Sequence, residues 1–217
     1  MAVLDTDILT QLQYHVVEPE IDGGVTWALG DWTAATVINY LNQRQNRFLQ
    51  ETGIRVTRDT TIITTPNVHR YELPDDLLRI NRLSWRALDG GSTVELPRSD
   101  TWVFDNGYPD WQYETAARPS LYTEYEVPQR IVQLMPASWD GGVLHLLYVA
   151  AGTALNNAGI ALSVPDECAP FILWGTLSDM LRETARVQDK SRAEYCEARY
   201  QLGVESTLIL LNSWTSY

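Results

Sequence analysis

The sequence predicts an α+β fold in which an antiparallel β-subdomain is inserted into a helical bundle of two N-terminal and two C-terminal helices. Apolar residues recur every three or four positions near both ends of the chain, as on one face of a helix. The middle is rich in β-branched residues and in alternation, as in half-buried strands. We therefore expect N-terminal helices in 1–53, a β-rich insertion in 54–160, and C-terminal helices with a docking tail in 161–217.

Two helices are predicted before the insertion. The first runs from Asp5 to about Val17, capped by Asp5 or Thr6 and ended by Pro19. The second follows Asp31-Trp-Thr and ends near Thr52, with Gly53 as its C-cap. Its polar face is expected to be solvated or available to a neighbour, and it comprises Asn42, Arg44, Gln45 and Arg47.

The insertion is predicted to hold about six strands. Residues 56–73 have the pattern of hairpin structure, and a strand follows from Arg79 to Leu88 before the turn at Asp89-Gly-Gly. A short helical turn near 99–104 then precedes an irregular loop. The remaining strands are expected at 93–96, 119–126, 130–134 and 143–150.

Helical spacing returns after Pro165 and continues to about Ala185. Asp189 is expected to cap a further helix, which Gly203 either ends or kinks. Both signs of charge alternate on these helices, which suits either a solvated face or a contact between subunits. The apolar run near the C-terminus either folds back onto the bundle or docks on a partner. Its residues are Leu208, Ile209, Leu210, Leu211 and Trp214.

The formal charge of −12 argues against function through phosphate binding, which needs clustered Lys and Arg. Cys168 and Cys196 are expected to be reduced thiols. Without a signal-like start or a long apolar run, we expect a protein made and kept in a cytoplasm, with no membrane partner.

No pattern in the sequence predicts catalysis, a cofactor or a metal site. His15, His69 and His145 lack the spacing of metal ligands, and no nucleophile or phosphate-binding motif is present. The carboxylates that a glycosidase would need are scattered over turns and strands. We therefore expect that the protein is not an enzyme.

Tryptophan and tyrosine are abundant, with eight and eleven copies against three phenylalanines. Such amphipathic rings favour interfaces and sugar sites as well as cores. Many of them gather in the insertion, and those of its loop are Trp102, Tyr108, Trp111 and Tyr113.

The order of these signals resembles that of head-to-tail adaptors of tailed bacteriophages, over nearly the whole chain. The segments that carry the resemblance are Asp31-Trp-Thr, Ile38-Asn-Tyr-Leu-Asn, Arg47-Phe, Tyr71-Glu-Leu-Pro-Asp-Asp-Leu-Leu-Arg-Ile-Asn-Arg-Leu, Pro109-Asp-Trp, Pro119-Ser-Leu-Tyr, Ile131-Val-Gln-Leu-Met-Pro, Leu144-His-Leu-Leu-Tyr, Val164-Pro-Asp, Asp189-Lys-Ser-Arg-Ala-Glu-Tyr and Arg199-Tyr-Gln-Leu-Gly-Val.

The resemblance implies a virion protein that joins the capsid portal to the tail as a dodecameric ring around the DNA channel. It further implies that the C-terminal segment docks on the portal and that the β-subdomain faces outwards or towards a tail or nozzle protein, with tail fibres as further candidates. DNA would pass without specific binding. The alternative is a carbohydrate-binding β-sandwich module of a virion or tail-associated protein.

Overall fold

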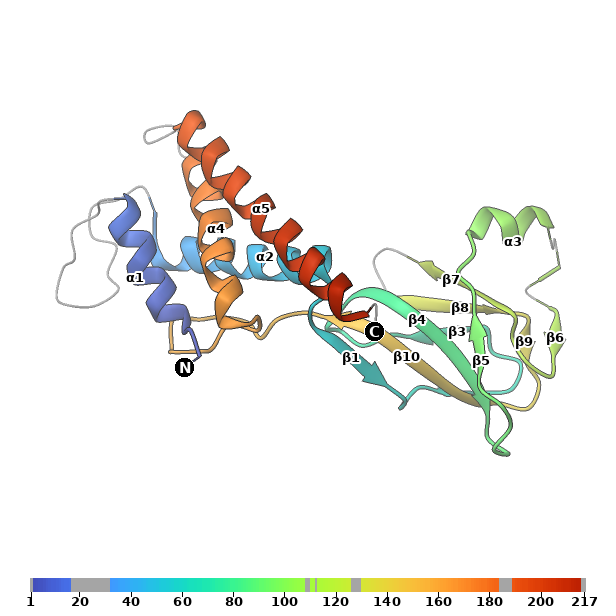
Figure 1. Ribbon diagram of the computed structural model, residues 1–217. Helices are drawn as coiled ribbons and strands as arrows, with labels where there is room; N and C mark the ends of the chain where they lie inside the picture. Colours follow the sequence, from blue (N-terminus) through green and yellow to red (C-terminus); the bar gives the residue numbers. More distant parts are fainter. Residues whose placement is uncertain are drawn as a thin grey trace. The chain divides into compact units, whose positions relative to one another are not determined.

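The computed structural model describes residues 2–16, 32–107, 110–111, 113–125, 130–183 and 189–215. The chain forms two compact units (Figure 1). Residues 1–55 and 151–217 make a helical unit, and residues 56–150 make a β-rich unit. The fold is therefore mixed, with helices and mainly antiparallel sheets.

The described residues of the helical unit form four long helices. These are α1 (Asp5–Val16), α2 (Ala34–Thr52), α4 (Ala169–Glu183) and α5 (Lys190–Thr215), and the short 3-10 turn η1 (Asp166–Cys168) precedes α4. Thr33 caps α2 through a bond from the Thr36 N–H, and Gly53 ends it in the left-handed conformation, at φ 66°. Each helix contributes buried apolar side chains, among them Leu9, Leu41, Leu177 and Val204. None of the described helices is long and apolar enough to cross a membrane.

Asp5 connects the start of α1 to a distant loop. Its carboxylate, with no exposed surface, accepts hydrogen bonds from the backbone N–H groups of Asn156, Asn157, Gly159 and Ile160, at 2.8–3.2 Å. It also accepts from the N–H of Thr6. Several N–H donors around one carboxylate offset the cost of burying it. Asp5, one of the two residues expected to cap α1, thus organises a loop about 150 residues later in the chain.

The polar face expected on α2 is wrong in part, because two of its members are buried. Arg44 is 2% exposed and Gln45 is fully buried. The Gln45 amide donates to the Thr153 carbonyl and accepts from the Ser163 N–H. The polar groups of α2 thus bind the segment that follows the β-rich unit. Arg47 remains partly exposed, and Asn42 exchanges hydrogen bonds with Leu155.

The β-rich unit consists of two main sheets and a small strand pair. The larger sheet has the order β1 (Val56–Asp59), β10 (Gly142–Ala150), β4 (Leu77–Ala87), β5 (Val94–Leu96), with β2 (Ile63–Thr64) also paired to β10. The second sheet has the order β3 (Arg70–Glu72), β8 (Ile131–Met135), β7 (Leu121–Tyr125). β6 (Thr115–Ala116) and β9 (Ala137–Ser138) pair in parallel, and α3 (Thr101–Gly107) follows β5.

The strands between 56 and 73 do not pair with one another as the hairpin prediction required. β1 and β2 pair with β10, and β3 pairs with β8. The turn at Asp89-Gly-Gly does join the paired strands β4 and β5, with Gly90 at φ 88°. Strand location was thus predictable from alternation, whereas pairing with distant strands was not.

The two main sheets contribute to one apolar core. Leu83, Trp85 and Leu146 come from the larger sheet, and Val132 and Leu134 come from the smaller one. All five side chains are almost completely buried. Along most of the central strand β10, buried residues such as Leu146 alternate with partly exposed ones, as expected for a sheet packed on one side.

Candidate assembly surfaces

The described residues hold no set of side chains arranged for metal binding. No three His, Cys, Asp or Glu side chains among them converge as ligands. The histidines lie apart, with His15 in α1, His69 before β3 and His145 in β10. The His145 ring bonds Arg58 at 2.9 Å, and partial burial with the nearby Arg58 and Arg86 charges lowers the pKa of His145. Cys168 and Cys196 are free and buried, and burial raises the pKa of both thiols.

A buried ion-pair network joins α2, α4 and α5. The Arg44 guanidinium donates two hydrogen bonds to Asp179 of α4, and two more at 2.8 and 3.3 Å to Glu197 of α5. A planar guanidinium with several N–H groups can bind two carboxylates at once. Burial alone would lower the pKa of Arg44, but the two carboxylates raise it above its usual value. Arg44 therefore stays charged and connects three helices.

Tyr200 extends this network across α5. The Arg44 and Arg47 guanidiniums lie 4.9 and 5.7 Å from its ring centre, and its hydroxyl donates to Glu51 at 2.8 Å. Burial and the bond to Glu51 raise the pKa of Tyr200 well above its ordinary value. Sequence reasoning missed this network, although the spacing of Leu41, Arg44 and Phe48 places the arginine on the buried stripe of α2.

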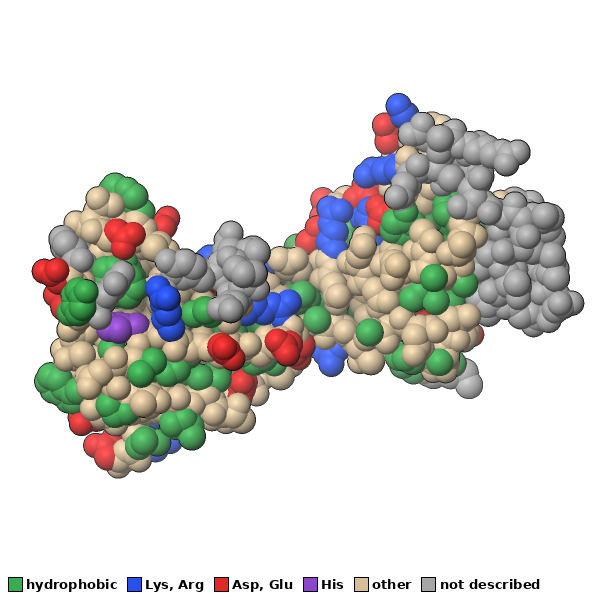
Figure 2. Space-filling view, turned by 180° about the vertical axis from the view of Figure 1, so that it is seen from behind, with side chains coloured by type: hydrophobic (Ala, Val, Ile, Leu, Met, Phe, Trp, Pro, Cys, Tyr) green, Lys and Arg blue, Asp and Glu red, His purple; other side chains and the backbone are tan. Residues whose placement is uncertain are grey.

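A hollow of about 380 Å³ opens beside the network. Figure 2, a view from behind, shows acidic and basic side chains close together on the helical unit. The residues that line the hollow include no His, Cys, Ser or Thr. Its charged rim suits a polar contact with another protein. The lining residues are Tyr40, Gln43, Arg44, Arg47, Asp179 and Arg182.

The C-terminal turns of α5 present apolar side chains. The helix continues through Gly203 to Thr215, so the apolar run is helical. Ile209 is 69% exposed and Leu210 is 59% exposed, whereas Leu208 and Leu211 are partly buried. The side chain of Trp214 lies outside the described residues. Two of the five candidate docking residues thus present a large apolar surface to solvent.

The aromatic residues around α3 differ in environment. Trp102 and Tyr113 are 69% and 84% exposed. Trp111 is buried, with its ring 5.3 Å from that of Phe104 and its indole N–H donating to Asp105. Tyr108 lies outside the described residues. Trp111 therefore anchors α3, while Trp102 and Tyr113 remain available for contact.

Exposed apolar and aromatic side chains, such as Ile209, Trp102 and Tyr113, are typical of surfaces that contact other proteins. Residues 6–213 match the family described as SU10 adaptor protein. This match spans nearly the whole chain, and the chain belongs to that family of phage head-to-tail adaptors. The resemblance in the sequence is thereby confirmed. A comparison with curated proteins finds no match.

Proposed function

We propose that the protein joins the capsid portal to the tail, as a ring of twelve copies around the DNA channel. Membership of the adaptor family over residues 6–213 is the observation that carries this proposal. The protein would be assembled in the host cytoplasm and would lie in the neck of the virion, between capsid and tail. It would act as a structural component without catalysis.

The portal contact is assigned to the end of α5. Exposed aliphatic side chains on a helix can bury their apolar surface in a groove of a partner protein. Ile209 and Leu210 offer such surface. The assigned residues are Leu208, Ile209, Leu210, Leu211 and Trp214.

The tail contact is assigned to the aromatic residues around α3. Exposed Trp and Tyr side chains are frequent in the energetically dominant part of interfaces. Trp102 and Tyr113 would contact a tail or nozzle protein, or tail fibres, with Trp111 holding α3 in place and Tyr108 in the same loop.

The charge of the chain supports passage of DNA through the ring without binding. Twelve copies, each carrying −12, would present no general attraction for phosphates. The carbohydrate-binding alternative would use the exposed rings of the β-rich unit, but family membership favours the adaptor. In that alternative the four long helices would have only an attachment role.

The test is the mass of the purified protein, alone and mixed with the purified portal ring of its phage, measured by light scattering. We expect the chain to join the portal as a stoichiometric ring. A variant shortened after Thr207 and the Ile209→Glu variant should both lose this binding. The shortened chain ends beyond Gly203 because Val204 and Thr207 are buried and needed for packing.

Leu88→Glu is the matched control, because Leu88 is 63% exposed and lies in the β-rich unit. It should bind the portal like the natural chain. If the natural chain fails to bind the portal at all, the adaptor proposal is wrong. Glycan binding by the β-rich unit then becomes the function to test.

A further inference from the structure

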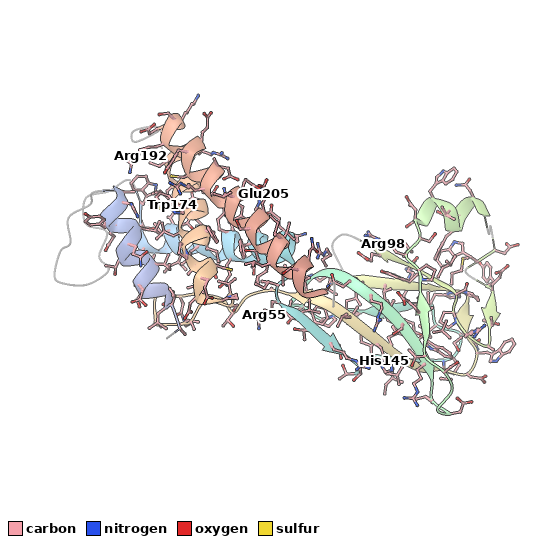
Figure 3. All side chains as sticks on the ribbon, in the orientation of Figure 1. Arg55, Arg98, His145, Trp174, Arg192 and Glu205 are labelled. Atoms are coloured by element: carbon pink, nitrogen blue, oxygen red, sulfur yellow. The ribbon has the colours of Figure 1, made fainter. Side chains whose placement is uncertain are left out.

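Four aromatic rings form a continuous row across α1, α4 and α5 of the helical unit. The ring centres of Tyr14 and His15 are 6.1 Å apart, those of His15 and Trp174 are 5.2 Å apart, and those of Trp174 and Tyr195 are 6.1 Å apart. We name these four residues the aromatic ridge. It is distinct from both surfaces assigned above. Figure 3 labels Trp174 and also Arg192, which lies near the start of α5.

Two residues of the ridge are exposed, whereas His15 and Trp174 are half-buried, and the ridge is held in place. Tyr14 is 82% exposed and Tyr195 is 51% exposed. The Arg199 Nε donates to the Tyr195 hydroxyl at 2.9 Å, and its guanidinium carbon lies 5.2 Å from the ring centre. Arg192 donates to the His15 carbonyl at 2.8 Å. Side chains fixed in advance lose little entropy on binding, which favours their use in an interface.

Apolar surface continues from the ridge along α5. Leu202 follows Tyr195 by seven residues, which returns to nearly the same side of a helix, and it is 54% exposed. The opposite side of this helix is already buried by Ala193, Cys196 and Tyr200. A helix that carries apolar residues on opposite sides is usually covered on both in its working state.

Charges around the ridge indicate what covers it. Lys190, Arg192 and Arg199 are exposed near it, as is the acidic Glu194. Glu197, in the same stretch, binds Arg44 at 2.8 Å, and Asp189 accepts from the Arg192 N–H to cap α5. The exposed rim of the ridge thus carries three cations against Glu194, an excess of positive charge in a chain whose formal charge is −12. A second copy of this acidic chain is a complementary partner.

We propose that the aromatic ridge docks on a second copy of this chain, at the acidic end of that copy's helical unit. This end is formed by Asp7, Asp166 and Glu167, all of which are exposed. Asp166 accepts from the Val3 N–H and Asp7 accepts from the Leu4 N–H, so the two carboxylates lie beside the same turn of backbone.

The two surfaces lie near opposite ends of α1, which has 12 residues and a length of about 18 Å at 1.5 Å per residue. A contact between two different surfaces of identical chains is head-to-tail and closes into a ring when the rotation between copies allows it. The inference thus names the contact between neighbours in the ring and rests on the proposed function.

The experiment places a photoreactive residue on the ridge, as Tyr14→p-benzoylphenylalanine, and irradiates the full chain alone and with the portal ring. We expect covalent adaptor dimers whose cross-link maps to the segments around Asp7 and Asp166. The same residue in place of Leu88 is the control and should give no dimers. Cross-links from Tyr14 to the portal alone, or to nothing, overturn the proposal.

A charge exchange tests the acidic end. Arg199→Glu in the cross-linking chain should reduce dimer yield roughly tenfold, because like charges then meet across the contact. Combining it with Glu167→Arg should restore the yield, and a yield that is indifferent to these changes overturns the assignment of this end. Portal binding without dimer cross-links would overturn this inference and leave the proposed function intact. Dimer cross-links without portal binding would overturn the proposed function and leave the contact between copies intact.

Discussion

Arg44 is a charged residue in the interior of the helical unit, and its contribution to stability depends on its two carboxylate partners. Replacing one member of a buried ion pair leaves the other charges without compensation, which costs about 3–5 kcal/mol. A surface pair contributes about 0–1 kcal/mol. Arg44 forms a buried ion pair, and Arg47, one helical turn later, forms a largely exposed one.

We therefore expect Arg44→Met to lower the free energy of unfolding by about 3–5 kcal/mol, because Asp179 and Glu197 would lose their shared cation. Arg47→Met should cost less than about 1 kcal/mol, since Arg47 is 47% exposed. Urea unfolding followed by circular dichroism measures both. Equal effects of the two substitutions would contradict a structural role for the Arg44 network.

The same network predicts how stability depends on pH. Burial would raise the pKa of Glu197, but the Arg44 bond outweighs it and the pKa lies below the ordinary 4.5. The folded state then binds fewer protons than the unfolded state near that pH, so stability is full above about pH 4.5 and is lost as the pH falls. The contribution of Tyr200 to stability changes with pH in the opposite direction, because the pKa of Tyr200 is raised above the ordinary 10.0. Its contribution is full below pH 10 and is lost as the pH rises further.

Unfolding free energies measured from pH 3 to pH 11 should therefore decline at both ends of the range. Tyr200→Phe should make the alkaline decline shallower and leave the acid one in place, because phenylalanine has no ionisable hydroxyl. The part of the alkaline decline that remains is expected from Cys168 and Cys196, whose pKa values are also raised. An alkaline decline of the same slope in the variant would show that another group causes it.

At the scale of the element, α5 depends on a glycine in its middle. A Cβ at Gly203 would overlap the ring of Phe171 in α4, so the two helices approach too closely for any side chain there. In an exposed helix Gly→Ala is stabilising by about 1 kcal/mol. Here the overlap should dominate.

We expect Gly203→Ala to destabilise the protein by about 1–3 kcal/mol, as overpacking does. In a Phe171→Ala background the same substitution should become neutral or stabilising, because the overlapping ring is gone. Urea unfolding of the natural chain, the two single variants and the double variant gives the coupling energy between positions 171 and 203. A Gly203→Ala effect that is unchanged by Phe171→Ala would refute the close approach.

Elements with local sequence signals could be predicted, whereas features that depend on distant residues could not. The helices were predictable because periodicity and capping residues such as Thr33 and Asp189 are local signals. The expected end or kink at Gly203 had no such support, since only the position of Phe171 explains this glycine. The pairing of β1 with β10 could not be predicted, because it joins residues about 90 positions apart.

The candidate surfaces were predictable to a lesser degree. Apolar residues at the end of α5 and aromatic residues near α3 could be identified from composition. Which of them are exposed depends on tertiary packing, which buries Trp111 and exposes Trp102. The aromatic ridge needed the structure, since it joins side chains from three separate helices.

At the scale of the whole molecule, the two chain segments that link the units are bonded to each other on each side of the boundary. Arg55 donates to the Ala151 carbonyl at 3.0 Å, and Val56 pairs with Val149 in the sheet. Each unit has its own buried core, with no need for the other to complete the strand pairing.

We therefore expect residues 56–150 to fold on their own, and a chain with these residues replaced by a short glycine-serine loop to keep its helical fold. Circular dichroism and cooperative urea unfolding of both pieces measure this. Portal binding should remain with the helical piece, because it carries the end of α5. A non-cooperative transition in either piece would show that the units stabilise each other.

The division of the helical unit between the two ends of the chain also sets an order of events during synthesis. The β-rich unit is complete once residue 150 has left the ribosome, whereas Arg44 meets its partners only after Glu197 has also left it. Translation at about 5–20 residues per second separates these two moments by several seconds. During that interval a nascent chain in polysomes carries a finished β-rich unit while the surfaces on α5 do not yet exist, so neighbouring nascent chains cannot join through α5.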